Sequence, residues 1–181
     1  MPSLPTLECG TFTNIANTAI VGTNPVLENI AGTDDADYVY TSQNATGTKT
    51  AEFTLSDMPS DFSTMATLSV QFRSAVQTGS QVNTWNGIIV EVRKSAAEGS
   101  GLLGTTSLLG PNTSTTPTNS NIFGLGSLDT SATKDSWNNG VVLILFSITR
   151  NKGGDTLERR IFAVEFTGTY NTLERKVFTI T

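Results

Sequence analysis

Apolar residues alternate with polar ones along most of this 181-residue chain. In the clearest segment, Leu68, Val70 and Phe72 alternate with Ser69 and Gln71. The same period recurs at residues 50–55, 88–93 and 161–167. A period of two is that of a strand with one buried face. Glycine, asparagine and aspartate separate these segments, so the pattern predicts an all-β protein, an antiparallel β-sandwich of the jelly-roll type.

The length and composition fit one such sandwich. A chain of 181 residues is long enough for one well-packed core and short for two. Only 15% of the residues are charged, which is typical of a sandwich with polar, uncharged loops. We therefore expect a single domain over residues 21–181, preceded by an extended arm or edge strand over residues 1–20. Within the domain, the wholly apolar run of residues 141–146 predicts a central strand.

Turn signals predict the local boundaries. Ser56 or Asp57 is a candidate cap for a single helical turn over residues 56–62. Asn86-Gly87 is a turn dipeptide, although Trp85 also fits a strand already begun. Residues 168–171 are expected to turn, and the low-complexity run at 112–121 is expected to be a solvated loop.

The composition excludes much catalytic chemistry. There is no histidine and a single cysteine, so histidine-dependent triads, imidazole zinc sites and an internal disulfide are ruled out. A glycosidase needs only two carboxylates, and the strands offer Glu52, Glu91 and Glu165. Glu91 has Arg93 on its own face, which indicates a surface ion pair. We therefore expect no enzyme, and a hydrolase using Glu91 or Glu165 ranks third among the functions considered.

The net charge of −5 disfavours a nucleic-acid partner, because such proteins present clustered bases to phosphates. The longest apolar run, residues 141–146, is too short for a membrane span. The first residues lack the basic and apolar regions of a signal peptide, so synthesis in a cytoplasm is expected.

Two clusters of charged residues are candidate binding features. Asp34, Asp35 and Asp37 crowd one loop and offer oxygen ligands for calcium, but a turn bonding its own backbone explains them equally well. No cofactor is therefore expected. A repeated Thr-Leu-Glu-Arg sequence begins at residues 156 and 172. It is interpreted as two strands with similar edge chemistry, with Glu and Arg pointing outward. The alternative is a basic ridge for partner binding, made of Arg159, Arg160, Arg175 and Lys176.

Three segments in order carry a family resemblance: Asp37-Tyr-Val-Tyr40, then residues 51–61 with their Leu-Ser-Asp-Met-Pro corner, then residues 66–73 ending in Val-Gln-Phe-Arg. Their layout resembles jelly-roll structural proteins of tailed bacteriophage virions, and similar layouts occur in carbohydrate-binding jelly rolls. The resemblance covers roughly residues 34–93. It implies a head decoration (cement) protein or a component of a tail or fibre.

The leading expectation is a non-enzymatic virion structural protein that decorates the outer surface of a phage head as a symmetric homo-oligomer. Its partners would be the major capsid protein or other virion proteins. Its amino-terminal residues would pair with a neighbour's sheet edge, through Pro2, Leu4, Pro5 and Leu7. The alternative is a carbohydrate-binding jelly-roll module of a phage tail or fibre, used for host attachment. Its expected stacking platforms are Trp85, Trp137, Tyr38 and Tyr40.

Overall fold

The computed structural model describes residues 1–16, 18–21, 38–41, 47–77, 83–95, 101–110, 112–150 and 158–173. In this part the chain forms eleven strands and one short helix. They are β1 (Leu7–Ala16), β2 (Thr18–Val21), β3 (Tyr38–Thr41), β4 (Gly47–Leu55), β5 (Phe62–Val76), β6 (Asn83–Arg93), β7 (Leu102–Thr105), β8 (Thr118–Asn119), β9 (Phe123–Gly124), α1 (Lys134–Asn138), β10 (Val141–Arg150) and β11 (Arg159–Thr172). The helix is far too short and polar to cross a membrane.

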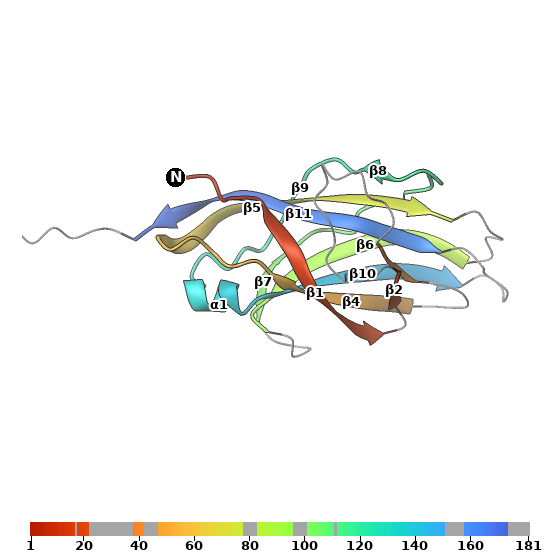
Figure 1. Ribbon diagram of the computed structural model, residues 1–181, viewed down its shortest axis with the longest axis horizontal. Helices are drawn as coiled ribbons and strands as arrows, with labels where there is room; N and C mark the ends of the chain where they lie inside the picture. The colour runs from red at the N-terminus through yellow and green to blue at the C-terminus, as the bar shows by residue number, and fades with distance from the viewer. Residues whose placement is uncertain are drawn as a thin grey trace, which may run out of the picture.

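The strands form two antiparallel sheets packed face to face. The first sheet runs β2–β3–β11–β5, with β8 and β9 both along the far edge of β5. The second runs β1–β4–β10–β6–β7. Figure 1 shows them as an upper layer with β5 and β11 and a lower layer with β4 and β10. The predicted all-β sandwich is confirmed.

The pairing of strands is nested in the manner of a jelly roll. Strand β3 pairs with β11, β4 with β10, β5 with β8 and β9, and β6 with β7. Strands early in the chain thus pair with strands late in the chain, and the last pair of this nested series, β6 with β7, joins two strands that are consecutive in sequence. This is the order expected when a long hairpin folds over into two sheets.

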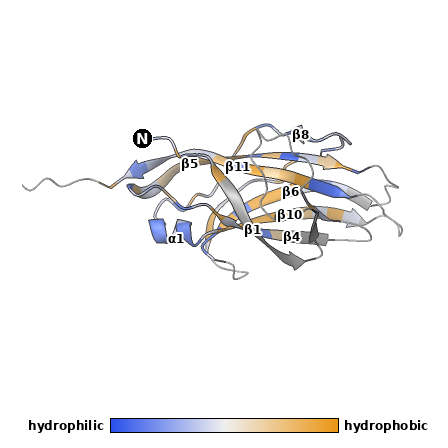
Figure 2. Ribbon diagram, viewed as in Figure 1, coloured by the Kyte–Doolittle hydropathy of each residue, from blue (hydrophilic) through white to orange (hydrophobic). Residues whose placement is uncertain are grey.

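The core lies between the two sheets and follows the alternation seen in the sequence. Leu68, Val70 and Phe72 of β5 are buried and belong to one core cluster with the buried apolar side chains of β6 and β10. Figure 2 shows the apolar stretches concentrated on the strands of both layers. Strand β10 is buried on both faces from Val141 to Ile144, which confirms the predicted central strand.

Strand β1 belongs to both sheets and closes one edge of the sandwich. Leu7 pairs with Phe166 of β11, whereas Cys9 pairs with Leu55 of β4. Figure 1 shows β1 crossing diagonally from the upper layer to the lower one. The side chains of Leu4 and Leu7 are buried in the protein's own core. The first residues therefore form an edge strand and not a free arm, and these two leucines are not presented to a partner.

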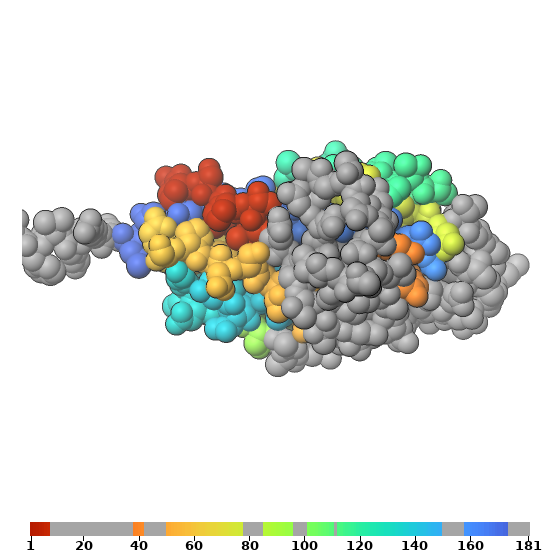
Figure 3. Space-filling model, viewed as in Figure 1, coloured from red at the N-terminus to blue at the C-terminus, as the bar shows by residue number. Residues whose placement is uncertain are grey.

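Exposed Pro2 and Pro5 lie on this same edge. The carbonyl of Pro2 accepts a hydrogen bond from the Tyr170 backbone N–H, 3.2 Å long. Proline has no backbone N–H to donate, so prolines at a sheet edge disfavour the pairing of a further strand there. In Figure 3 the amino terminus (red), the segment after β4 (yellow-orange) and the α1 region (cyan) gather at one end of the molecule.

The segment after β8 closes the opposite edge. Phe123 and Gly124 pair with β5 in the first sheet. Two residues later, Gly126 exchanges two backbone hydrogen bonds with Thr105 of β7 in the second sheet, 2.8 and 3.1 Å long. A four-residue segment thus passes from one sheet to the other.

Three predicted boundaries are wrong. Residues 56–62 form no helix; the segment turns and buries Met58, whose N–H donates to Asn138 over 2.8 Å. Asn86-Gly87 lies inside β6, where the register with β10 shifts and Gly87 adopts a φ of 136°. Residues 168–171 continue β11 and do not turn. In each case tertiary pairing overrides a local signal.

Candidate ligand-binding site

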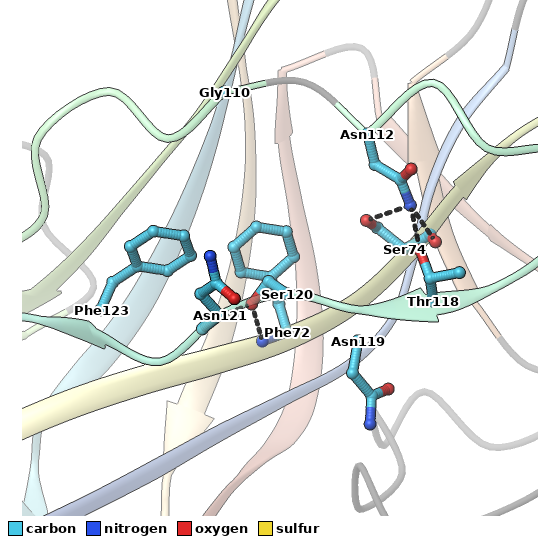
Figure 4. Close-up of a pocket in the computed structure, with 9 residues that line it drawn as sticks. All are labelled: Phe72, Ser74, Gly110, Asn112, Thr118, Asn119, Ser120, Asn121 and Phe123. Atoms are coloured by element: carbon cyan, nitrogen blue, oxygen red, sulfur yellow. Dashed lines mark hydrogen bonds between the residues drawn. The ribbon is translucent and has the colours of Figure 1, made fainter.

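A pocket of about 320 Å³ opens at the edge where β8 and β9 run along β5 (Figure 4). Its far wall is the chain at Gly110, next to Leu109, which bridges to Ile88 of β6. The pocket therefore lies between the two sheets at their edge. It is lined by Phe72, Ser74, Gly110, Asn112, Thr118, Asn119, Ser120, Asn121 and Phe123.

Two phenylalanines form the apolar part of the pocket. Phe72 comes from β5 and Phe123 from β9, and their rings stack with centroids 6.0 Å apart and planes 17° apart. Phe72 is buried and belongs to the core, whereas Phe123 is half-buried and packs against it. The ring pair is thus held from behind by the core.

Asn112 forms a fixed polar wall. Its Nδ2 donates to the Ser74 hydroxyl over 3.1 Å and to the Thr118 hydroxyl over 2.9 Å. Its Oδ1 accepts from the Ser114 backbone N–H over 2.9 Å. Ser74 is buried, so this network ties the loop after Gly110 to the inner side of β5. The polar groups of this wall are positioned before any ligand arrives.

The Asn121 side chain lies beside the two rings (Figure 4). Its neighbour Ser120 is fixed: the Ser120 hydroxyl accepts from the Phe72 N–H over 3.1 Å and donates to the Asn121 carbonyl over 2.6 Å. The exposed side chain of Asn121 makes no hydrogen bond within the described residues. A carboxamide offers two N–H donors and one oxygen acceptor, all available here to a ligand.

The pocket carries no formal charge. None of its nine lining residues is ionisable. Arg73 reaches its rim, where Nη1 donates to the Asn119 Oδ1 over 3.2 Å. The combination of an apolar ring pair with amides and hydroxyls suits a neutral ligand rich in polar groups, since a charged ligand would find no counter-charge among the lining side chains.

The two tryptophans expected to stack on sugars are packing residues. Trp137 is fully buried, at 0% exposed, and Trp85 is 8% exposed. The Trp85 Nε1–H donates to the Gly87 carbonyl over 3.0 Å, inside β6. Neither indole presents a face to solvent, so the structure corrects their assignment as stacking platforms.

Tyr38 and Tyr40 lie half-buried on β3, in contact with each other at a centroid distance of 5.9 Å. The Arg160 guanidinium lies 4.5 Å from the centre of the Tyr38 ring and pairs with Glu158 over 2.6 Å. Burial raises the pKa of Tyr38 above its ordinary value, and Arg160 opposes that rise. This surface is separate from the pocket lining.

The structure describes two of the four residues of the predicted basic ridge. Arg159 is fully buried, whereas Arg160 is engaged by Glu158 and Tyr38. Arg175 and Lys176 lie outside the described residues, as do the calcium candidates Asp34, Asp35 and Asp37. Within the described residues, no three acidic or cysteine side chains come together as metal ligands would.

The strand carboxylates do not meet in the pocket. Glu91 forms the expected ion pair with Arg93, 2.8 Å long, on the second sheet. Glu165 lies on β11 in the first sheet. Glu52 and Glu91 both pair in register with Leu143, so they share a face two strands apart, a backbone separation of roughly 10 Å.

Glu52 is 5% exposed and its Oε2 has no hydrogen-bond partner in the described part of the chain. Burial raises its pKa, so the folded state favours the protonated form. Relative to the ionised form, protonated Glu52 favours folding. This contribution to the free energy of unfolding is present at acidic pH and is lost as the pH rises through the folded-state pKa. We expect Glu52→Gln to increase the free energy of unfolding at pH 7 by about 1 kcal/mol, measured by urea denaturation.

Glu91→Gln is the matched control for that substitution. It removes a partly exposed ion pair, so stability should fall by at most about 1 kcal/mol. A Glu52→Gln variant that is less stable than the native protein at pH 7 would show that the ionised carboxylate is well accommodated.

The pocket was not predicted from the sequence. Its polar residues fall mostly in the run at 112–121, which was expected to be a solvated loop. Many of these residues are indeed exposed, but Asn112 and Ser120 bond to β5, 38 and 48 positions earlier. The one available signal was the spacing of three asparagines, Asn112, Asn119 and Asn121, close to Phe123.

No family model and no curated protein matches this chain. Similar solved structures include an arabinose-bound GH51 α-L-arabinofuranosidase, with 10% identity, 88% of this chain and 23% of that chain covered, and a TM-score of 0.49. Another is SGBP-B from a complex xyloglucan utilization locus in Bacteroides uniformis, with 10% identity, 88% of this chain and 47% of that chain covered, and a TM-score of 0.46.

A third is a GH43 arabinoxylan arabinofuranohydrolase from Bacillus subtilis in complex with cellotetraose, with 16% identity, coverage of 87% and 28%, and a TM-score of 0.40. The chain spans less than half the length of each of these proteins. At such identities and TM-scores the matches assign this chain to no family.

Proposed function

We propose that this chain is a non-catalytic carbohydrate-binding β-sandwich that holds a neutral sugar in the pocket described above. The observation that carries the proposal is the half-buried ring of Phe123, stacked on the core residue Phe72, beside the Asn121 carboxamide, which has no hydrogen-bond partner among the described residues. The ordered Asn112 network completes the polar side. This retains the second of the two functions expected from the sequence and moves its site from the tryptophans to this pocket.

The chemistry of a sugar matches that lining. A pyranose has apolar C–H faces that pack on aromatic rings and a rim of hydroxyls that pair with amides. Ring contact alone would leave the hydroxyls unpaired, and such desolvated groups weaken binding. An accessible aromatic ring and a carboxamide in one pocket can satisfy both parts of the ligand.

The absence of a carboxylate among the nine lining residues supports binding without hydrolysis. Glycosidases place two carboxyl groups on either side of the bond they cleave. Here Glu91 is held by Arg93 and Glu165 lies on a different sheet from it. A hydrolase would need its acids in the pocket.

Phe123→Ala should weaken glycan binding about tenfold, because one aromatic contact is worth about 1 kcal/mol or slightly more. The measurement is titration calorimetry with neutral oligosaccharides that the native chain retains on an immobilised glycan panel. Ile122→Ala is the matched control: Ile122 is 64% exposed and adjoins Phe123 without lining the pocket. Retention of no glycan by the native chain, or equal affinity for Phe123→Ala, would contradict the proposal.

Association with a virion stays a prediction from the resemblance. A glycan-binding module of a phage tail or fibre would agree both with that prediction and with the sugar binding proposed here. Removal of the first residues is a poor test of it, since Leu4 and Leu7 are core residues. Quantitative mass spectrometry of purified particles is the better measurement. A copy number comparable to the major capsid protein would favour head decoration, whereas a few copies would favour a tail or fibre.

A further inference from the structure

We infer that the pocket selects an acetamido sugar, of the N-acetylhexosamine class, over the corresponding plain hexose. This inference rests on the proposed function and concerns the ligand of the same site. It follows from which groups in the pocket remain without partners and from how they are arranged.

The first requirement is a small apolar group on the ligand. Phe123 is half-buried, and its ring is stacked at 17° on Phe72, which is buried in the core, so Phe123 presents a rigid apolar surface to the pocket. A hydroxyl placed against it would lose its water without gaining a hydrogen bond. A methyl group placed there buries apolar area on both partners. The acetyl methyl is such a group.

The second requirement is a donor and an acceptor next to that methyl. The Asn121 carboxamide is the lining side chain beside the rings that has no partner in the described part of the chain (Figure 4). It presents N–H donors and an oxygen acceptor in one plane. The acetamido group is a trans amide whose N–H and carbonyl point in opposite directions, so one of these groups can bond to the Asn121 carboxamide while the adjacent methyl lies against the ring. A hydroxyl in the same position can also bond to the carboxamide, but it brings no methyl group to the ring.

The third observation is the size of the pocket. Its volume of about 320 Å³ lies at the lower end of the range of about 300–1,000 Å³ found for ligand sites. The Gly110 wall stands opposite β8 and β9. This suits a single sugar, such as a terminal or branching residue, better than a continuous run of a polysaccharide.

The probes are methyl glycosides of N-acetylglucosamine, N-acetylgalactosamine, glucose and galactose, titrated into the full chain by calorimetry and by saturation-transfer NMR. At least one acetamido sugar should bind ten times more tightly than its hexose counterpart, with the strongest saturation transfer at the acetyl methyl. Asn121→Ala should reduce acetamido binding to the level of the hexose. Asn121 is exposed, so the fold should tolerate this change.

Gly110→Gln tests the location of the site. A Cβ at Gly110 meets no atom within 4 Å, and its φ lies outside the left-handed region, so a side chain there should obstruct the pocket without disturbing the fold. Gly124 has the same open surroundings but does not line the pocket, which makes Gly124→Gln the matched control. Binding should be lost in the first variant and kept in the second.

The outcomes separate the two proposals. Equal affinity for hexose and acetamido sugar, with both lost in Gly110→Gln, would overturn the selectivity and leave sugar binding intact. Binding of none of the four glycosides, together with no retention on the glycan panel, would overturn both. Acetamido binding that survives Gly110→Gln would overturn the assignment of this pocket.

Discussion

Trp137→Ala is expected to lower the free energy of unfolding by about 3–5 kcal/mol, the usual cost of removing a buried large aromatic side chain. Trp137 is the largest fully buried side chain of the described residues and joins α1 to the core. For a chain of this size the melting temperature should fall by about 10 °C. Denaturant titration and calorimetric melting measure both quantities.

Trp137→Phe is the control that separates the effect of lost side-chain volume from the effect of removing the indole N–H. The Trp137 Nε1–H has no acceptor within the described residues, so its removal relieves an unpaired donor while the phenyl ring keeps most of the volume. Its cost should be well below that of alanine. Glycan binding measured below the melting temperature should be unchanged in both variants. Loss of binding with unchanged stability would restore Trp137 as a stacking platform.

Gly87→Ala should destabilise the protein by about 2–5 kcal/mol, combining backbone strain with a steric clash. Gly87 has a φ of 136°, which side chains rarely allow, and an added Cβ would overlap the carbonyl oxygen of Leu109. That carbonyl accepts from the Ile88 N–H over 3.1 Å, and the Leu109 N–H donates back over 2.8 Å. The substitution would therefore break the bridge that places Gly110, and sugar affinity should fall together with stability.

Gly110→Ala is the matched control, because its Cβ would enter open space at an ordinary φ. Its stability should stay within about 0.5 kcal/mol of the native value. Both variants are measured by denaturant unfolding, with sugar affinity as the second readout. A Gly87→Ala variant with native stability would show that β6 can pair with β10 without the register shift and the positive φ at Gly87.

The sequence anticipated those strands that bury one face. Alternation located β5 and β6, and the apolar run located β10, because these patterns report burial directly. Turn chemistry was less informative. Asn86-Gly87 and residues 168–171 have turn residues, yet long-range pairing with β10 and β5 holds both in strands. The short helix α1 escaped notice because its five residues are too few to show a helical period.

The candidate site was harder to anticipate. Its aromatic pair joins β5 to β9, and its asparagine network joins a polar run to Ser74. Neither contact leaves a local pattern, because each is made by residues about forty or more positions apart. The tryptophans were chosen for their chemistry, but burial decides whether an aromatic ring meets a ligand. The tyrosines of β3 remain partly accessible, next to Arg160.

The nested pairing also sets the order in which the protein can assemble during its synthesis. Strand β11 lies at the centre of the first sheet, where it pairs with β5, β3 and the start of β1. None of those pairings can form until the chain has emerged from the ribosome as far as β11. Before then, β5 lacks the strand with which it forms its longest ladder of backbone hydrogen bonds. We expect a slow final step, on the millisecond-to-second scale of non-local β topologies, and a nascent chain that relies on chaperones until then.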